Sequence, residues 1–447
     1  ANLTGKVISK DMVEMAKQYV PKMKAEGADL VVAIPHSGLE VGDAQAMQEN
    51  ATYHLSKVEG VDAILFGHAH SLFPGGKAYN GFEEQGVDNV KGSINGIPAV
   101  MPGFWANHLG LIDMDLAYKE GKWTVAGFKT ELRSVKEVEP DAEVAASVAA
   151  EHEATNEWVS KPFAKIAAPV NSFFALAQDD PSIQIVSDAQ IWYGKQLIQG
   201  TEFDGLSVLS AAAPFRAGRQ GSGDFTSVPA GDIAYRNVAD MYIYPNTLQI
   251  LKLTGAQVRG WLEMSAGQFN QIDPASTEPQ SLINTKFPSY NFDVIDGIEY
   301  EIDVSQAARY DKSGNLVDVN NSRIKNITYL GAPINLTHKF LVVSNNYRAS
   351  GGGNFPGISS EKIVVDAPNE NRQAVADYLI FSTNENPETG FDPSADGNWS
   401  FTPLANTRVV FKGSSKDAAQ TFAGENPALN YSSLDANGYG VYSLDLG

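Results

Sequence analysis

Two histidines two residues apart close an apolar stretch of the chain, in the run Gly67–His70 that follows Asp62–Phe66. Side chains two positions apart point to the same side of extended backbone, so His68 and His70 can bind metal ions next to each other. A third histidine, His36, follows a similar apolar stretch in the run Pro-His-Ser-Gly. We predict that these three imidazoles are metal ligands. The alternative is that they only cap strand ends and bond to backbone groups.

The elements around these histidines alternate between helix and strand, which is typical of α/β layering. The spacing of apolar residues predicts helices over 12–23, with Pro21 as a kink, and over 43–58, and strands over 29–34, 62–66, 110–116 and 122–128. Both histidine-bearing loops then follow the carboxyl ends of strands, where sheets of this kind usually form their sites.

Composition limits the functions that this chain can have. It has 447 residues, a formal net charge of −20 and no cysteine. This charge argues against binding to nucleic acid or to an anionic membrane. Without cysteine there are no thiolate ligands, so a metal site must use His, Asp, Glu or Asn. The sequence also has no apolar run of about 18 residues that could span a membrane.

The pattern of expected elements changes near residue 160, from alternating helices and strands to short strands with many turns, and this indicates two domains. The segment 138–160 is rich in Ala and Glu, and we expect it to form a connecting helix. Residues 1–137 form the first domain in this interpretation. Residues 161–447, with short strands and many turns, form a second domain of the α+β class.

Two segments of the second domain combine tyrosines with turn residues. They are Met241–Leu248, which contains Tyr-Pro-Asn, and Val342–Gly357, in which an aromatic residue precedes three glycines. Glycine allows close approach of backbone to a ligand, and an aromatic ring beside it offers a stacking face. The alternative is that the glycines form ordinary turns and the tyrosines pack.

The pair of motifs V-A-I-P-H-S-G and L-F-G-H-A-H resembles the closing motifs of calcineurin-like metallophosphatases of the 5′-nucleotidase superfamily. The resemblance implies the C-terminal part of a four-layer αββα domain and a dinuclear centre that cleaves phosphate esters. It assigns His36 and His68 to one metal ion and His70 to the other. The ions expected for this family are Mn, Co, Zn or Mg.

The earlier motifs of that superfamily, of the types D-x-H-G, G-D and G-N-H-E, are not found in this sequence. Two neighbouring divalent ions need several anionic ligands to offset their mutual repulsion, and neutral imidazoles alone do not provide these. We therefore expect that the chain begins part-way through the metallophosphatase domain. On this expectation the chain alone lacks a complete dinuclear site, and the missing segment is a possible partner. No catalytic residue is assigned.

The second domain resembles the C-terminal nucleotide-binding domain of the same superfamily, in particular its 2′,3′-cyclic-nucleotide 2′-phosphodiesterase/3′-nucleotidase branch. The resemblance implies that Tyr244 and Tyr347 sandwich the nucleobase, with Asn246 as a polar neighbour. It makes Arg216 and Arg219 candidates for contacts with ribose or phosphate, although surface ion pairing is an alternative. The sequence departs from the 5′-nucleotidase pattern where G-G-D is replaced by Gly-Gly-Asn, and where N-G-G-G-x-R is replaced by Ala-Ala-Ala-Pro-Phe-Arg.

The function implied is metal-dependent hydrolysis of 2′,3′-cyclic nucleotides and 3′-nucleotides, with release of nucleoside and phosphate. The alternatives are a nucleotide-binding fragment without turnover, and a 5′-nucleotidase or sugar-nucleotide hydrolase. The resemblance also implies a periplasmic or secreted bacterial protein that binds small nucleotides.

Overall fold

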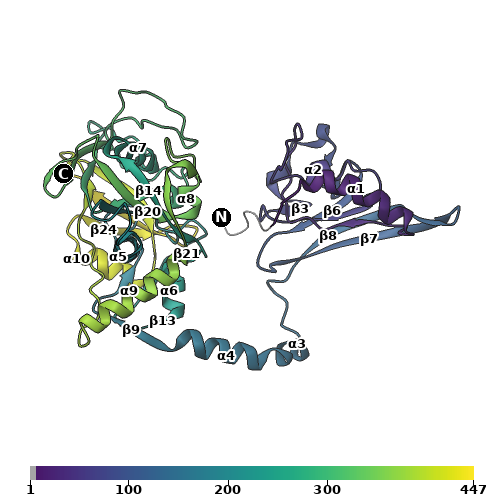
Figure 1. Cartoon of the computed structure of the whole chain (residues 1–447), viewed down its shortest axis with the longest axis horizontal. Helices are drawn as coiled ribbons and strands as arrows, with labels where there is room; N and C mark the ends of the chain where they lie inside the picture. The colour runs from purple at the N-terminus through teal and green to yellow at the C-terminus, as the bar shows by residue number, and fades with distance from the viewer. Residues whose placement is uncertain (1–6) are drawn as a thin grey trace. The chain divides into compact units, whose positions relative to one another are not determined.

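The computed structural model describes residues 7–447 and divides into two compact units, one ending at Ala149 and one spanning Ala150–Gly447 (Figure 1). The boundary between them lies inside the segment 138–160 that was predicted to connect two domains. Within residues 7–447, no helix is long and apolar enough to cross a membrane.

The first unit is built on a small mixed sheet, in which the strands that carry the histidine loops are parallel neighbours. Its order is β1-β2-β6-β5-β4, with β3 paired to β6. The strands are β1 (Val32–Ala33), β2 (Ala63–Leu65), β3 (Leu72–Phe73), β4 (Val87–Asp88), β5 (Ser93–Ile94) and β6 (Ile97–Pro102). Its core is apolar and includes Ile64, Phe73, Ile94 and Met101. This is the α/β layering that was predicted, with strands shorter than expected.

Helix α1 (Met12–Ala25) contains Pro21, as predicted, and begins at Asp11, whose carboxylate accepts hydrogen bonds from the Val13 and Glu14 amides at 2.9 Å. The helix predicted over 43–58 is wrong, because only α2 (Thr52–Leu55) is helical there. Met47 has a φ of 60°, in the left-handed region, and its N–H donates to the Asp11 carboxylate at 2.7 Å. A backbone held in this way cannot continue a right-handed helix.

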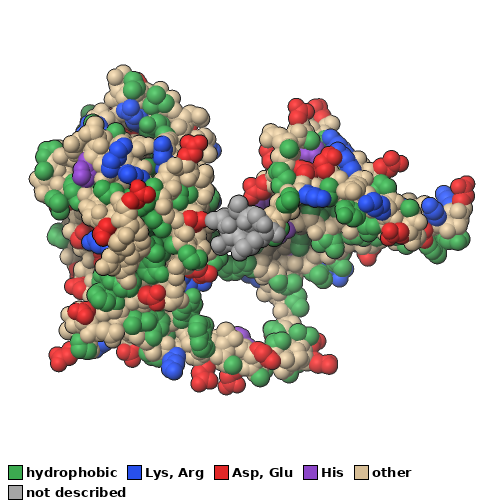
Figure 2. All heavy atoms as spheres, in the orientation of Figure 1, with side chains coloured by type: hydrophobic (Ala, Val, Ile, Leu, Met, Phe, Trp, Pro, Cys, Tyr) green, Lys and Arg blue, Asp and Glu red, His purple; other side chains and the backbone are tan. Residues whose placement is uncertain are grey.

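Two long strands, β7 (His108–Lys119) and β8 (Lys122–Ser134), form an antiparallel hairpin and confirm the strands predicted at 110–116 and 122–128. The connecting segment differs from the prediction, since it contains two helices, α3 (Ala142–Ser147) and α4 (Ala149–Ser160), separated at Val148. No residue of either helix is buried, and Figure 2 shows acidic side chains along them. Without an apolar face to bury, nothing holds this segment as one continuous helix.

The second unit centres on a five-stranded sheet of order β16-β11-β20-β14-β21. Strand β20 (Lys339–Asn345) is buried almost throughout and pairs parallel to β11 (Ser207–Ala212) and antiparallel to β14 (Thr247–Thr254). The outer strands are β16 (Val294–Asp296) and β21 (Ile363–Glu370). The helices that pack around this sheet are α5 (Pro181–Ile198), α7 (Gly255–Ser265) and α9 (Asn371–Glu385), as Figure 1 shows.

Two four-stranded sheets complete the second unit, in the orders β15-β23-β25-β24 and β19-β18-β17-β22. Their strands are β15 (Gln280–Ser281), β17 (Glu299–Ile302), β18 (Ile324–Tyr329), β19 (Ala332–Pro333), β22 (Trp399–Phe401), β23 (Arg408–Gly413), β24 (Leu429–Leu434) and β25 (Gly440–Asp445). The smaller elements are β9 (Pro162–Ile166), β10 (Val170–Asn171), β12 (Ser227–Val228), β13 (Gly231–Ala234), α6 (Tyr235–Met241), α8 (Asn346–Ala349) and α10 (Asp417–Glu425).

Two aspartates lie close to each other at helix α5: Asp188, which is partly buried within the helix, and Asp296, which is buried in β16. The Gln184 amide donates to Asp188 at 3.1 Å and to Asp296 at 2.8 Å. Burial, reinforced by the nearby Asp396 carboxylate, raises the pKa of Asp296 to about 7 and that of Asp188 to about 6. These acids therefore hold protons at pH values where an exposed aspartate is ionised.

Candidate functional site

The parallel pairing of β1 and β2 brings His36 and His68 together. In this pairing Val32 lies opposite Ala63, and Ala33 lies opposite Ile64. Both strands end there, so the loops that follow them start at the same edge of the sheet. The His36 and His68 rings meet edge to face, with centroids 5.2 Å apart. These are the two imidazoles that the family resemblance assigns to one metal ion.

The loop that carries His68 and His70 is held in an unusual backbone conformation. Their φ angles are 68° and 53°, in the left-handed region that residues other than glycine seldom adopt. Strain of this type collects at functional sites, where the surrounding fold maintains it. The two rings have different neighbours: the His68 ring meets His36, and the His70 ring stacks on Phe104 with centroids 5.2 Å apart.

A carboxylate that the sequence patterns did not indicate reaches His68. The Glu49 carboxylate lies 2.7 Å from His68 Nε2, and its side chain is otherwise exposed. Glu49 lies in an irregular loop rather than in the helix predicted there, so its spacing from His68 gave no signal.

The ligand set present does not fit a dinuclear metal centre. Among residues 7–447 there is no group of three or more His, Cys, Asp or Glu side chains placed to hold a metal ion. His36 and His68 are brought together with Glu49 near one of them, whereas the His70 ring packs on Phe104. The assignment of the three histidines as ligands therefore stays a prediction.

The sheet of the second unit brings the two tyrosine loops to the same end. Strand β14 runs antiparallel to β20, and Leu248 near the start of one pairs with Asn345 at the end of the other. Tyr244 precedes the first of these residues by four positions, and Tyr347 follows the second by two. The Thr247 amide also donates to the Asn346 side chain at 3.2 Å and joins the two loops.

Both tyrosines offer ring surface to solvent, since Tyr244 is 39% and Tyr347 is 47% exposed. The Tyr244 ring meets Phe215 edge to face, with centroids 5.2 Å apart, and the Tyr347 ring meets Tyr290 at 6.4 Å. Partial burial raises the pKa of Tyr347, so it stays a neutral phenol near neutral pH. Exposed rings braced in this way are suited to stacking on a planar ligand.

Asn246 has a structural role that is visible in its bonds. Its backbone carbonyl accepts hydrogen bonds from the backbone and side-chain amides of Asn371 at 2.8 and 3.2 Å. These bonds tie the Tyr244 loop to the start of helix α9. The Asn246 backbone therefore holds the loop that carries Tyr244 in place.

The two predicted arginines have different surroundings. Arg216 forms ion pairs with Asp224 and Asp240, which agrees with the alternative of structural ion pairing. Arg219 lies over the Tyr290 ring, with its guanidinium 4.6 Å from the ring centroid. Tyr290 also contacts Tyr347, so Arg219 lies near the tyrosine loops. Arg216 is instead paired with Asp224 and Asp240.

A buried ion pair supports the Tyr347 loop from below, and no sequence pattern pointed to it. The Arg348 and Asp293 side chains are 2% and 4% exposed, and Arg348 Nε lies 2.6 Å from Asp293 Oδ2. The Trp261 indole N–H donates to the same oxygen at 2.7 Å, and the Gly352 carbonyl accepts from the Arg348 guanidinium. The glycine loop after Tyr347 is therefore hydrogen-bonded to the buried Arg348 side chain, which Asp293 holds in position.

Comparison with known proteins places the chain among nucleotide hydrolases. Residues 162–360 match the model of the 5′-nucleotidase C-terminal domain. A solved structure from Staphylococcus aureus, described as a 5′-nucleotidase in complex with α-ketoglutarate, superposes on this chain with a TM-score of 0.58 and 18% sequence identity. The superposition covers 88% of this chain and 68% of the Staphylococcus aureus chain. At this identity the likeness shows a shared fold.

Curated relatives define the family more closely. The 2′,3′-cyclic-nucleotide 2′-phosphodiesterase/3′-nucleotidase of Salmonella typhimurium is 45% identical over 464 residues, covering 100% of this chain and 70% of the relative. The trifunctional nucleotide phosphoesterase of Bacillus subtilis is 47% identical over 99% of this chain, which spans only 30% of that protein. The chain belongs to the 2′,3′-cyclic-nucleotide 2′-phosphodiesterase/3′-nucleotidase family, a family of hydrolases.

Proposed function

We propose that this protein hydrolyses 2′,3′-cyclic nucleotides and 3′-nucleotides and releases nucleoside and phosphate. The observation that carries the proposal is the 45% identity, extending over the whole chain, to the Salmonella typhimurium enzyme named for both activities. Since this chain spans 70% of that relative and 30% of the Bacillus subtilis one, the activity proposed is that of the full-length protein.

In this proposal the second unit binds the nucleoside through Tyr244 and Tyr347. Stacking on an aromatic ring contributes about 1–3 kcal/mol per base and accepts any base, because every base has a planar face. The shared sheet edge of the two loops and the partial exposure of both rings support this role. Arg219 is placed near them through Tyr290 and is the better candidate for an anionic group of the nucleotide.

The calcineurin-like phosphoesterases to which the resemblance points use divalent metal ions. We propose His36, His68 and His70 as the ligands that this chain contributes. Because residues 7–447 do not assemble a complete ligand set, no catalytic step is assigned to them. The family resemblance further leads us to propose a periplasmic or secreted location, which cell fractionation tests directly.

The test compares hydrolysis of 2′,3′-cyclic AMP, 3′-AMP and 5′-AMP by the full-length protein, with Mn²⁺, Co²⁺, Zn²⁺ or Mg²⁺ added. We expect turnover of the first two substrates, loss of turnover in His36→Ala, and a raised KM in Tyr244→Ala. Preference for 5′-AMP contradicts the proposal in favour of a 5′-nucleotidase. Nucleoside binding without turnover under any metal identifies a binding protein instead.

A further inference from the structure

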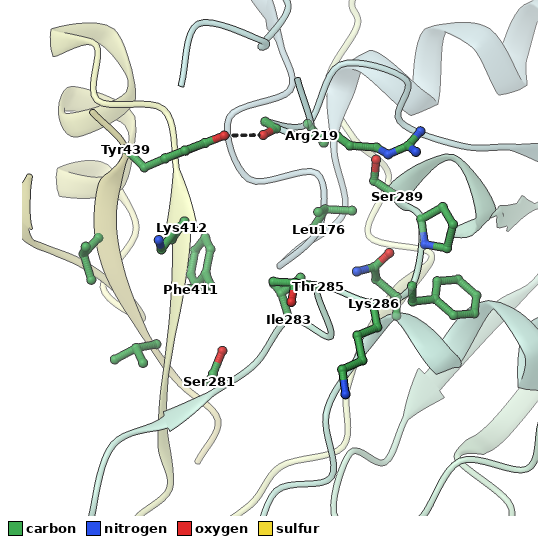
Figure 3. A pocket seen from close by; sticks show the side chains of 17 residues that line it. Leu176, Arg219, Ser281, Ile283, Thr285, Lys286, Ser289, Phe411, Lys412 and Tyr439 are labelled. Carbon is green, nitrogen blue, oxygen red and sulfur yellow. Dashed lines mark hydrogen bonds between the residues drawn. The ribbon is translucent and has the colours of Figure 1, made fainter. Parts of the chain in front are cut away.

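A cavity of about 520 Å³ opens in the second unit, between the loop 281–289 and the C-terminal sheet (Figure 3). We call it the C-terminal cavity; strands β23 and β25 contribute Phe411, Lys412 and Val441 to its wall. Its volume lies within the range of about 300–1,000 Å³ typical of small-molecule sites. Neither Tyr244 nor Tyr347 lines it, although Arg219 in its wall lies over Tyr290, which contacts Tyr347.

The cavity combines an apolar wall with positive charge. Leu176, Ile283 and Phe411 supply apolar surface, and the charged residues that line it are all cationic: Arg219, Lys286 and Lys412. This is unusual in a chain with a net charge of −20. A local cluster of one sign attracts a ligand of the opposite sign.

Two of these cations are left without an acidic partner. Lys412 Nζ lies 2.6 Å from Asp435 Oδ2, so its charge is already balanced. Within the 7–447 range that the structure describes, no carboxylate oxygen lies within 4.0 Å of the Arg219 guanidinium or the Lys286 ammonium group. The Tyr439 hydroxyl donates to the Gly218 carbonyl at 2.7 Å and fixes the loop that carries Arg219 (Figure 3).

Buried polar atoms in the cavity wall also lack partners. Gln268 is 1% exposed, and its Oε1 accepts no hydrogen bond from the residues described. Ser289 is likewise buried, and its Oγ has no hydrogen-bond partner within the same residues. Buried polar groups are normally satisfied in native proteins.

We propose that the C-terminal cavity is a second ligand site, which binds an organic anion with a flat apolar body and one carboxylate or phosphate group. The apolar body packs on Phe411 and Ile283, and the anionic group binds the Lys286 ammonium group. This site goes beyond the proposed function, because it does not use the tyrosine pair or the histidines.

The test measures binding to the full chain by isothermal titration calorimetry with three matched probes: 1-naphthoate, 1-naphthylmethylphosphonate and neutral 1-naphthalenemethanol. The phosphonate resists hydrolysis and distinguishes a preference for phosphate from one for carboxylate. At least one anion is expected to bind about tenfold more tightly than the neutral probe, because it gains a charged hydrogen bond. Equal binding of all three probes overturns the proposal.

Variants locate the binding site. Lys286→Gln is expected to weaken binding of the preferred anion about tenfold, and Ile283→Trp, which places a larger side chain where the apolar body packs, is also expected to weaken it. Lys195→Gln removes an exposed charge near the end of α5 and is expected to change nothing. Equal affinities for Lys286→Gln and Lys195→Gln overturn the proposal, and since both side chains are exposed, neither change disturbs folding.

Tyr244→Ala separates this inference from the proposed function. We expect it to weaken adenosine binding and to leave binding of the naphthyl anion unchanged. Loss of naphthyl binding in this variant places the probe at the tyrosines and overturns the second site. Unchanged adenosine binding, in contrast, contradicts only the role of Tyr244 in holding the nucleoside.

Discussion

Replacing Asp293 by asparagine tests whether the buried ion pair beneath the glycine loop stabilises the second unit. The change keeps the shape of the side chain and an oxygen that can accept from the Trp261 indole, but it removes the charge opposite Arg348. The Arg348 guanidinium then stays buried without a counter-charge. We expect a loss of stability and a looser loop after Tyr347.

The magnitude follows from what Arg348 retains. Removing one member of a buried ion pair costs about 3–5 kcal/mol, because the remaining charge stays out of water. Arg348 still donates to the Tyr290 carbonyl and to Asn291 Oδ1, each at 2.9 Å. These neutral acceptors offset part of the loss, so we expect a cost of about 3 kcal/mol in the free energy of unfolding.

Urea unfolding followed by circular dichroism measures this cost. Asp445→Asn is the matched control, because it breaks an exposed pair with Arg408 in which Arg408 Nη2 lies 3.8 Å from Asp445 Oδ2. Exposed pairs contribute about 0–1 kcal/mol, so the control is expected to change little. If Asp293→Asn lowers the unfolding free energy no more than Asp445→Asn, the reasoning about the buried pair is refuted.

Three further predictions follow from other features. Gly353 has a φ of 78°, and a Cβ there would collide with Arg348 Nη1 and Asn291 Oδ1, whereas Gly331 has a φ of 75° and open space around it. Gly353→Ala should therefore lower the free energy of unfolding in urea more than Gly331→Ala does. Equal losses of unfolding free energy would show that the loop at Gly353 can move to accommodate the added methyl group. The pKa of Asp296 is raised from 3.8 to about 7, so its contribution to stability is fully present below about pH 4 and is lost as the pH rises through about 7. Because of this group, wild type should lose unfolding free energy between about pH 4 and about pH 7, and Asp296→Asn should lose less; parallel pH profiles would contradict this. Because α3 and α4 bury no residue, a glutamate-specific protease should cut first between residues 137 and 157, and mass spectrometry of early fragments that end elsewhere would count against it.

Local patterns predicted the parts of the fold whose causes are local. The hairpin β7–β8 and the helix α1 follow from the spacing of apolar residues, and the proximity of His36 and His68 follows from two strands that end side by side. The helix predicted over 43–58 failed because a distant carboxylate, that of Asp11, fixes the Met47 backbone. Sequence spacing does not reveal a bond of that range.

The same limit applies to the candidate sites. Tyr244 and Tyr347 could be recognised because loop motifs surround them, and the register of β14 and β20 then explains their placement. Asp293 and Arg348 are 55 positions apart and meet only in the folded core. Glu49 and the residues of the C-terminal cavity likewise come together through tertiary packing, which no short motif records.

The placement of the His36 and His68 loops on two paired strands has a consequence for length changes in this sequence. Because the strand ends position the imidazoles, the chain between them is free to vary in its exposed part, residues 42–46. A short insertion there should be accepted without separating the two rings. A single residue deleted from β1 or β2 would change the register and move one histidine away from the other. Segment 42–46 should therefore accept an insertion, whereas the nearby strands β1 and β2 should not accept a deletion.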